Sequence, residues 1–304
     1  MVDEYKISAG ADSLSEQKSQ LGSILRLAWV SWEFRVGLVF FVLLFMLAVL
    51  GPILIDISPT KIHVSKRFIP PLMSEGGQLK HIFGTDQLGR DLFIRSLIGL
   101  RNALIIGIVS VILMFALGSL IGIFAGFKGR WIDIVLMRIT DAQMSIPVVI
   151  LAIVILGISR PNVFSIIAVL VLGGWPVYAR VARSITLAER RQEYVRGATI
   201  LGASDFRIML RYIAPNILPP IALVGVLDVA RMMIFEAIFS FIGIGIQPPT
   251  PTFGTIIADG TNYLLNAWWI TTIPGILLTM SLCSISLMGG VLDRIRNRIL
   301  TGIE

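Results

Sequence analysis

The sequence predicts an all-α, polytopic membrane protein with six transmembrane helices, and two observations lead to that prediction. Of the 304 residues, 55% are hydrophobic and 15% are charged, whereas soluble domains carry about 25% charged residues. The apolar residues also gather in runs long enough to cross a bilayer, which takes roughly 20 helical residues for about 30 Å of hydrocarbon. A mean hydropathy of +0.84 is typical of the same class.

Six apolar runs are expected to span the membrane. The first follows a polar N-terminal segment and is longer than the apolar core of a signal peptide, so we expect the chain to retain it. The fourth is short and contains Gly173, Gly174 and Pro176, which predicts a broken or bent helix. The six runs are residues 34–55, 102–127, 131–158, 163–179, 217–246 and 270–292.

The distribution of positive charge orients these spans. If the N-terminus lies in the cytoplasm, the segments on that side hold 16 Lys and Arg residues and the outer segments hold 8, which agrees with the positive-inside rule. The resulting layout is a cytoplasmic N-terminal segment 1–33, a transmembrane domain 34–292 and a cytoplasmic tail 293–304. Within that domain we expect an outside loop 57–101 and a cytoplasmic loop 180–216, while the second outside loop is 247–268.

The first outside loop, 57–101, has two parts. Residues 57–83 contain three prolines and two glycines, which predicts an irregular excursion. In residues 85–101, leucines recur at helical spacing with charged residues between them. We therefore expect an amphipathic helix that lies in the outer interface, has Thr85 or Asp86 as its N-cap, and turns into the second span.

Motifs for catalysis are missing from the sequence. The two histidines, His63 and His81, have no cysteine or HExxH frame around them, so we expect loop histidines and no metal site. There is no G-x-S-x-G elbow and no G-x-x-x-x-G-K-[ST] phosphate loop. We therefore expect a non-enzymatic chain without a cofactor of its own, surrounded by lipid and without a nucleic-acid partner. Any ATP that drives it would bind to another polypeptide.

Several charges lie within or beside the apolar runs. Asp228 and Arg231 are three residues apart, on one face of a helix, and Glu236 follows five residues later. Asp141 lies three residues after Arg138, near the inner end of the third run. Because a lone charge in lipid costs several kcal/mol, such groups pair with one another or face a cavity. Two interpretations therefore stay open, namely structural ion pairs within each group or a polar lining of a translocation path.

The stretch 193–216, EYVRGATILGASDFRIMLRYIAPN, is a strongly polar segment between two apolar runs. Apolar residues alternate with arginines in it, and Gly202 is placed to end a short helix. Pro215 marks the point where we expect the chain to turn towards the fifth span. From the residues alone a positively charged inner loop is the simpler interpretation, and the helix–glycine–helix pattern suggests docking to a partner as the alternative.

Three separated segments resemble those of one transporter family. They are FGTDQLGRDLFIRSLIGLRNAL (83–104), LGASDFRIMLRYIAPNILP (201–219) and FSFIGIGIQPPTPTFGTIIADG (239–260). Each is similar to a segment of the second permease in the dipeptide/oligopeptide/nickel family of bacterial ABC importers, and 193–216 resembles the cytoplasmic EAA loop of such permeases. The resemblance covers nearly everything between residues 30 and 295.

This resemblance implies the type I permease fold of ABC importers, with a coupling helix that sits in a groove of a separate ATPase subunit. Gly202 matches the glycine of the EAA loop, Ala198 its preceding alanine and Pro215 its terminal proline. The chain departs from the pattern at Arg196-Gly197-Ala198, where Glu-Ala-Ala is usual, and at Ala214, where leucine is commoner. The coupling residues implied in this way are Glu193, Tyr194, Gly197, Ala198, Gly202, Ala203, Ser204 and Pro215.

The resemblance also implies partners and a reaction. One or two ABC ATPase subunits would bind ATP and Mg, a second homologous permease would complete the path, and an extracytoplasmic binding protein would deliver the solute. The chain would move a peptide or a related small solute through the plasma or inner membrane of a bacterial or archaeal cell by alternating access. The candidate path or structural charges are Asp141, Asp228, Arg231 and Glu236.

Two other functions are open from the residues alone. The first is an ion-coupled secondary transporter that uses Asp228, Arg231 and Glu236 as a relay, because broken helices and buried charges suit such proteins. The second is a membrane scaffold or receptor whose cytoplasmic loop binds a protein without transport.

Overall fold

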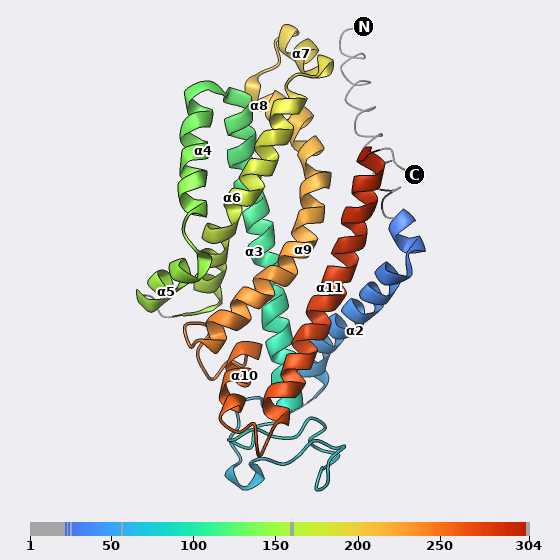
Figure 1. The fold of residues 1–304 in the computed structure, drawn as a ribbon, viewed down its shortest axis with the longest axis vertical. Coiled ribbons are helices and arrows are strands. Elements are labelled where there is room, and N and C mark those ends of the chain that lie inside the picture. Colours follow the sequence, from blue (N-terminus) through green and yellow to red (C-terminus); the bar gives the residue numbers. More distant parts are fainter. Residues whose placement is uncertain (1–21, 23, 25, 56, 159–160, 302–304) are drawn as a thin grey trace.

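The chain folds into a bundle of helices (Figure 1). A computed structural model describes residues 22, 24, 26–55, 57–158 and 161–301. Most of the expected N-terminal segment 1–33 lies outside these residues. Within them no strand is formed, and β-type pairing is limited to one isolated bridge between Thr85 and Asp91. The all-α class is confirmed.

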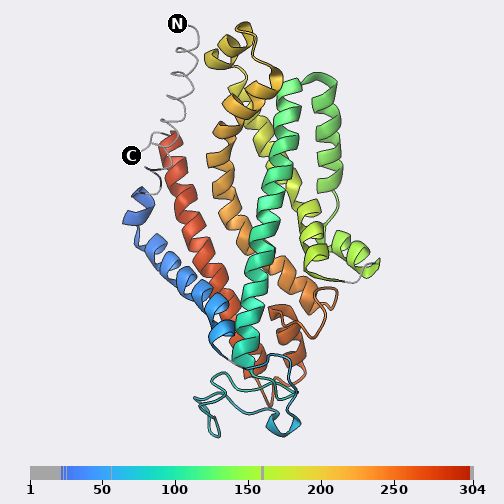
Figure 2. The same cartoon turned by 180° about the vertical axis from the view of Figure 1, so that it is seen from behind.

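Long helices make the body of the bundle, and short elements lie at its two ends and on one side (Figures 1 and 2). The long helices are α2 (Trp32–Leu54), α3 (Leu92–Lys128), α6 (Val163–Glu189), α9 (Ala214–Phe241) and α11 (Trp269–Thr301). The short elements are η1 (Val64–Lys66), α4 (Arg130–Met144), α5 (Val148–Ile158), α7 (Glu193–Ile200), α8 (Asp205–Ile208), the π-helical η2 (Met209–Ile213) and α10 (Phe253–Thr261).

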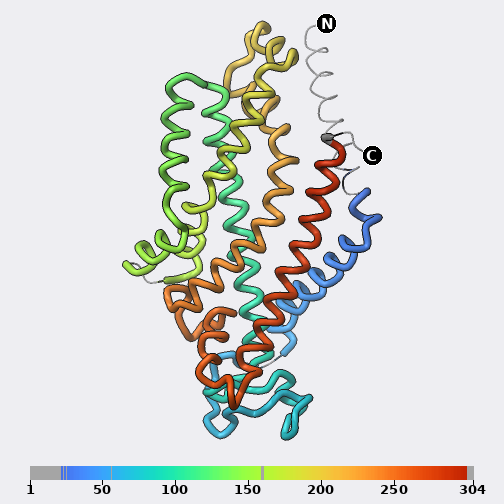
Figure 3. The backbone as a smooth tube through the Cα atoms, in the orientation of Figure 1, coloured from blue at the N-terminus to red at the C-terminus, as the bar shows by residue number. Residues whose placement is uncertain are grey.

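Different elements form the two ends of the bundle. The trace in Figure 3 places α7 and α8 at one end, together with the C-terminal part of α11. The loop 57–91 and α10 lie at the opposite end. Helix α11 continues through residues 293–301, so the expected tail is largely a helical extension.

Four of the described helices are long and apolar enough to cross a membrane, namely α2, α3, α6 and α11. The number rises to five if the bent pair α4–α5 is one span. The 28-residue helix α9, which carries Asp228, Arg231 and Glu236, is not among them. The chain is therefore a multi-pass membrane protein, but this criterion does not reach the six spans expected from the sequence.

The expected third span, 131–158, is not a straight helix. Helices α4 and α5 meet at an angle of 82°. Pro147 lies in the break, where it lacks a backbone N–H and disfavours helical geometry in the residue before it. As a result of this bend, α5 projects from the side of the bundle (Figure 1).

Helix α3 begins differently from the expectation for residues 85–101. It is one continuous helix of 37 residues from Leu92, with a largely buried start, so no separate helix lies in the interface. Asp91 is the N-cap, and its Oδ1 accepts hydrogen bonds from the Phe93 and Ile94 amides at 3.0 and 3.1 Å. Asp86 is not free for that role because its carboxylate accepts a hydrogen bond from the Arg90 Nε at 2.7 Å.

The fourth span was expected to be broken or bent, and a break does not occur. Helix α6 runs for 27 residues through Gly173, Gly174 and Pro176. Pro176 is buried within the helix. Neighbouring helices can compensate a proline inside a membrane helix, so its presence does not require a break.

A stripe of glycines on α3 allows this helix to pack closely against α6. A Cβ at Gly118 would lie 2.5 Å from the Trp175 carbonyl oxygen, and one at Gly126 would lie 3.0 Å from the Arg183 carbonyl oxygen. Gly122, between them, faces the backbone of α6 in the same way. Small residues four apart let two membrane helices approach at backbone distance. The α3–α6 pair therefore forms a close-packed seam in the bundle.

Polar side chains fasten the loop 57–91 to α10 and α11. Arg90 pairs with Asp86 and reaches Asp259 of α10 at 3.5 Å. The Trp269 indole donates a hydrogen bond of 3.2 Å to the Thr85 carbonyl. These bonds hold an irregular loop in one position against two helices.

Candidate functional site

Helix α7 ends as the sequence predicts, at Gly202. The Gly202 amide donates to the Thr199 carbonyl and the Ala203 amide to the Ala198 carbonyl, each at 3.0 Å. This pair of bonds is a Schellman motif, which needs a residue with positive φ after the helix. Gly202 has a φ of +77°, where other residues are strained.

The chain beyond Gly202 returns directly to the bundle. The Ser204 hydroxyl accepts a hydrogen bond of 3.4 Å from the Arg207 amide and caps α8. Helical backbone then continues through α8, η2 and α9. Pro215 lies in the first turn of α9, where its missing N–H is tolerated, so it does not mark the turn expected there.

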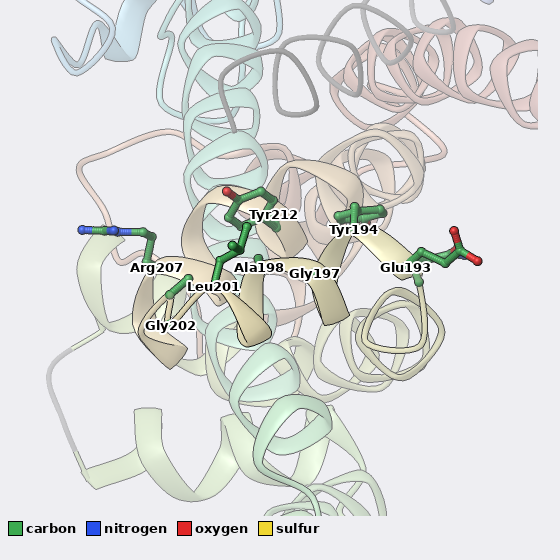
Figure 4. A pocket seen from close by; sticks show the side chains of 10 residues that line it. Glu193, Tyr194, Gly197, Ala198, Leu201, Gly202, Arg207 and Tyr212 are labelled. Carbon is green, nitrogen blue, oxygen red and sulfur yellow. The ribbon is translucent and has the colours of Figure 1, made fainter. Parts of the chain in front are cut away.

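The α7–α8 joint borders a groove with a volume of about 670 Å³, which we call the coupling groove because predicted coupling residues line it (Figure 4). Its apolar part includes Ala198, Leu201 and the rings of Tyr194 and Tyr212, whose centroids are 6.4 Å apart. Figure 4 shows Glu193 at one end and Arg207 at the other. The groove thus offers an apolar floor between an acidic and a basic end.

Most of the predicted coupling residues meet in this groove. Its lining includes Glu193, Tyr194, Gly197, Ala198, Gly202 and Ala203. Ser204 and Pro215 do not line it and act on the backbone of α8 and α9 instead. The coupling residues implied by the sequence did not include four further residues that complete the lining, namely Gln192, Leu201, Arg207 and Tyr212. Leu201 could have been predicted, because it lies three residues after Ala198 and therefore on the same face of the helix.

Three side chains tie α7 to the bundle, and we call them the clasp: Glu189, Tyr194 and Asn216. The Tyr194 hydroxyl donates a hydrogen bond to the Glu189 carboxylate. The Asn216 amide reaches both, at 2.9 Å to Glu189 Oε2 and 2.7 Å to the Tyr194 oxygen. Burial, and then the hydrogen bond to Glu189, raises the pKa of Tyr194, so the phenol stays protonated. The clasp thereby joins α7 to the end of α6 and the start of α9.

A second link joins the site to α3. Lys128, the last residue of α3, forms an ion pair of 2.7 Å with Asp205 at the start of α8. Both side chains are partly exposed, so the pair adds little to the free energy of unfolding. The pair matters because it connects the α7–α8 joint to α3, the longest of the described helices.

The charges of α9 form a pair and a separate carboxyl group. Asp228 is buried, forms an ion pair of 3.1 Å with Arg231, and accepts a hydrogen bond of 2.8 Å from the Tyr178 hydroxyl. Glu236 is buried as well and accepts a hydrogen bond of 2.8 Å from the Ser240 hydroxyl. Only Arg231 of the three is exposed. The structure therefore brings Asp228 and Arg231 together and does not join Glu236 to them.

Asp141 is shared between two arginines near the C-terminal end of α4. Its carboxylate lies 2.6 Å from Arg180 of α6 and 4.0 Å from Arg138. The pairing with Arg138 was expected from the sequence, and the closer one with Arg180 was not. Arg180 is 39 residues away in sequence, so helical spacing gives no signal for it.

The family described as "Binding-protein-dependent transport system inner membrane component" matches residues 118–297, which is more than half of the chain and includes the whole α7–α8 joint. The chain belongs to this family. As a member, it is a non-catalytic membrane component of a transport system.

This transport component is similar to curated permeases along most of its length. A putative peptide transport system permease protein of Brucella suis is 40% identical over 257 residues, 84% of each chain. The di/tripeptide transport system permease protein DppC of Pseudomonas aeruginosa is 32% identical over 253 residues, 83% of this chain and 84% of its own. The dipeptide transport system permease protein DppC of Haemophilus influenzae is 30% identical over 254 residues. The resemblance inferred from the three sequence segments is confirmed.

The permease also shares its fold with a solved transporter. A chain of the MetNI methionine ABC transporter, in an inward-facing form, matches with a TM-score of 0.54 and 18% identity. The match covers 67% of this chain and 96% of that one. At this identity the likeness shows the fold alone, and it confirms the ABC importer permease fold.

Proposed function

We propose that this permease is the membrane conduit of an ATP-driven importer that moves peptides or a related small solute into the cytoplasm. The relatives named above are peptide and dipeptide permeases, and similarity extends over 83–84% of this chain for the first and second of them. The names of those relatives support the proposed solute class, and the geometry of the α7–α8 joint supports the proposed way in which the chain is driven.

The observation that carries the proposal is the coupling groove and its two links to the bundle. A groove of about 670 Å³ opens at one end of the molecule, on a joint held by Gly202. The clasp ties that joint to α6 and α9, and the Lys128–Asp205 pair ties it to α3. A loop that only needed to be soluble would not require these bonds. We infer that a separate ATPase subunit seats on the joint and moves it.

The mechanism we propose is a rigid-body movement. Partner ATPase subunits bind ATP with Mg, close on each other and displace α7. Because α7 is bonded to the long helices, its displacement tilts the bundle and exchanges inward- and outward-facing states. This chain contributes no catalytic group and no cofactor of its own in that cycle.

The proposed arrangement places α7 in the cytoplasm and the loop 57–91 outside. A second permease would complete the path, and a binding protein would dock on the outer loops 57–101 and 247–268. Asp228 with Arg231 would lie along or beside the path. The ion pair with the exposed Arg231 would compensate the buried charge of Asp228 in either case, because a lone buried charge is costly.

Reconstitution tests this function against an ion-coupled secondary transporter. The chain is placed in proteoliposomes with its second permease, its ATPases and its binding protein, and uptake of a labelled dipeptide is measured. We expect uptake with ATP and none with a proton gradient alone. Gradient-driven uptake by the single chain without ATP would instead favour a relay through Asp228, Arg231 and Glu236.

A further inference from the structure

A second cavity lies on the opposite flank of α7 from the coupling groove. Its volume is about 530 Å³, and it lies between α7 and the ends of α3 and α6. We call it the cation pocket. Phe127 and Val195 form its buried apolar part, and the charged residues around it are Lys128, Arg190, Arg196 and Asp205.

The charges of the cation pocket are unbalanced. Of its described lining residues only Asp205 is acidic, and Lys128 already neutralises it at 2.7 Å. Arg190 and Arg196 form no ion pair with any residue in the described part of the chain. Two arginines therefore border one cavity without an anionic partner.

Arg190 is also held in place. Its guanidinium carbon lies 5.7 Å from the centre of the Phe127 ring, a cation–π contact, and this contact orders the side chain before any ligand arrives. A planar guanidinium offers paired donors that match a phosphate group. A pre-ordered arginine beside a second one is a suitable receptor for that chemistry.

The position of the pocket indicates the source of the phosphate. Lys128 is the last residue of α3, a candidate membrane span, and Trp131 follows in α4 with 69% of its surface exposed. Exposed tryptophan near a span end is typical of the level of lipid headgroups. Basic pockets between membrane helices at this level bind anionic headgroups.

We propose that the cation pocket binds the phosphate group of an anionic phospholipid and that the bound headgroup braces α7 from the side opposite the coupling groove. The proposal concerns binding, so it stands or falls independently of the transported solute. Occupancy would restrain α7 between lipid on one flank and the docked partner on the other.

The test is a titration of the purified permease complex in nonionic detergent, read as the shift in its thermal unfolding temperature. Short-chain phosphatidylglycerol, short-chain phosphatidylcholine and inorganic phosphate are added in separate arms. We expect a saturable shift with phosphatidylglycerol and none with phosphatidylcholine. Arg190→Gln with Arg196→Gln should weaken the apparent affinity about 30-fold, from roughly fivefold for each cation near a headgroup.

A charge-matched control separates the pocket from general electrostatics. Arg191 and Arg211 are exposed and do not line the pocket. Arg191→Gln with Arg211→Gln removes the same charge and should leave the affinity unchanged.

Equal weakening by both double variants, or no response to phosphatidylglycerol, would overturn the site. Binding of inorganic phosphate as tight as that of the lipid would overturn the assignment of its source. Loss of the ATPase subunits from the Arg190/Arg196 variant with unchanged lipid affinity would assign the two arginines to a protein partner and also overturn the proposal.

Discussion

The Asn216 side chain donates a hydrogen bond of 2.7 Å to the Tyr194 hydroxyl, across 22 residues of sequence. Tyr194 lies in α7 and Asn216 in the first turn of α9, so this bond joins the short helix of the coupling groove to a long helix of the bundle. Glu189 extends the same link to α6. A movement of α7 would therefore be transmitted directly to α6 and α9 through the clasp.

Tyr194→Phe tests the clasp. The variant keeps the ring but leaves the Glu189 carboxylate without its phenol donor, which should lower the free energy of unfolding by about 1.5–3 kcal/mol. It should also lower solute uptake per ATP hydrolysed several-fold while the ATPase subunits still co-purify. Tyr263→Phe is the control for stability, because the Tyr263 ring packs on Phe68 and its hydroxyl bonds to no described residue. An unchanged ratio of uptake to hydrolysis in Tyr194→Phe would contradict the role of the clasp.

Substitutions at Gly202 test the geometry of the joint. A Cβ there would meet no atom within 4 Å, so any effect comes from the backbone, whose φ is +77°. Gly202→Ala should cost roughly 1–2 kcal/mol, and Gly202→Asn less, because asparagine tolerates this conformation. Gly202→Glu should also place a charge in the coupling groove and abolish uptake while the protein still inserts into the membrane. Equal uptake in Gly202→Glu and wild type, measured in whole cells, would count against coupling through this joint.

The glycine stripe of α3 predicts a packing defect. Gly122→Ala puts a methyl group against the α6 backbone and should lower stability by about 1–3 kcal/mol. Gly275→Ala in α11 is the matched control, since a Cβ there would meet no atom within 4 Å. That substitution should be neutral or stabilising by up to about 1 kcal/mol, because alanine favours the helix. Thermal unfolding of the two purified variants decides the comparison.

Substitution of Asp86 tests whether its ion pairs hold the loop 57–91 in place. Asp86→Ala removes the carboxylate next to two buried arginines, Arg90 and Arg95, which lie 2.7 and 3.4 Å from it. Breaking a buried pair in this way should cost about 3–5 kcal/mol. We expect the outer loop to become sensitive to protease added from outside, whereas Glu75→Ala, at an exposed position, should not change the cleavage rate. Equal protease resistance in the two variants would show that the ion pairs do not hold the loop.

Local sequence patterns predicted the parts of this fold that local forces determine. The long apolar runs located most of the membrane helices, and Gly202 located the end of α7, because each signal lies within one segment. Bonds between distant segments were not predictable in the same way. Glu189 and Asn216 are 27 residues apart, and nothing near either residue indicates that they meet.

Three departures from the sequence prediction have local causes. Asp86 and Asp91 were both suitable N-caps, and the pairing of Asp86 with Arg90 left Asp91 to cap α3. Our prediction of one straight span over 131–158 missed the 82° bend, although Pro147 marks the place where it occurs. A proline gave the opposite error in α6, where Pro176 lies inside a helix that stays continuous.

The most direct test of the central claim is chemical protection at Gly197, which lines the coupling groove with open space in front of it. A Gly197→Cys substitution, made with Cys283→Ser to remove the only native cysteine, is labelled with a maleimide in inside-out membrane vesicles. If an ATPase subunit binds at the groove, the maleimide should label the introduced cysteine quickly in vesicles stripped of the ATPases. Labelling should be strongly suppressed in vesicles that retain them. Equal labelling in both preparations would show that the groove is not where the permease is driven.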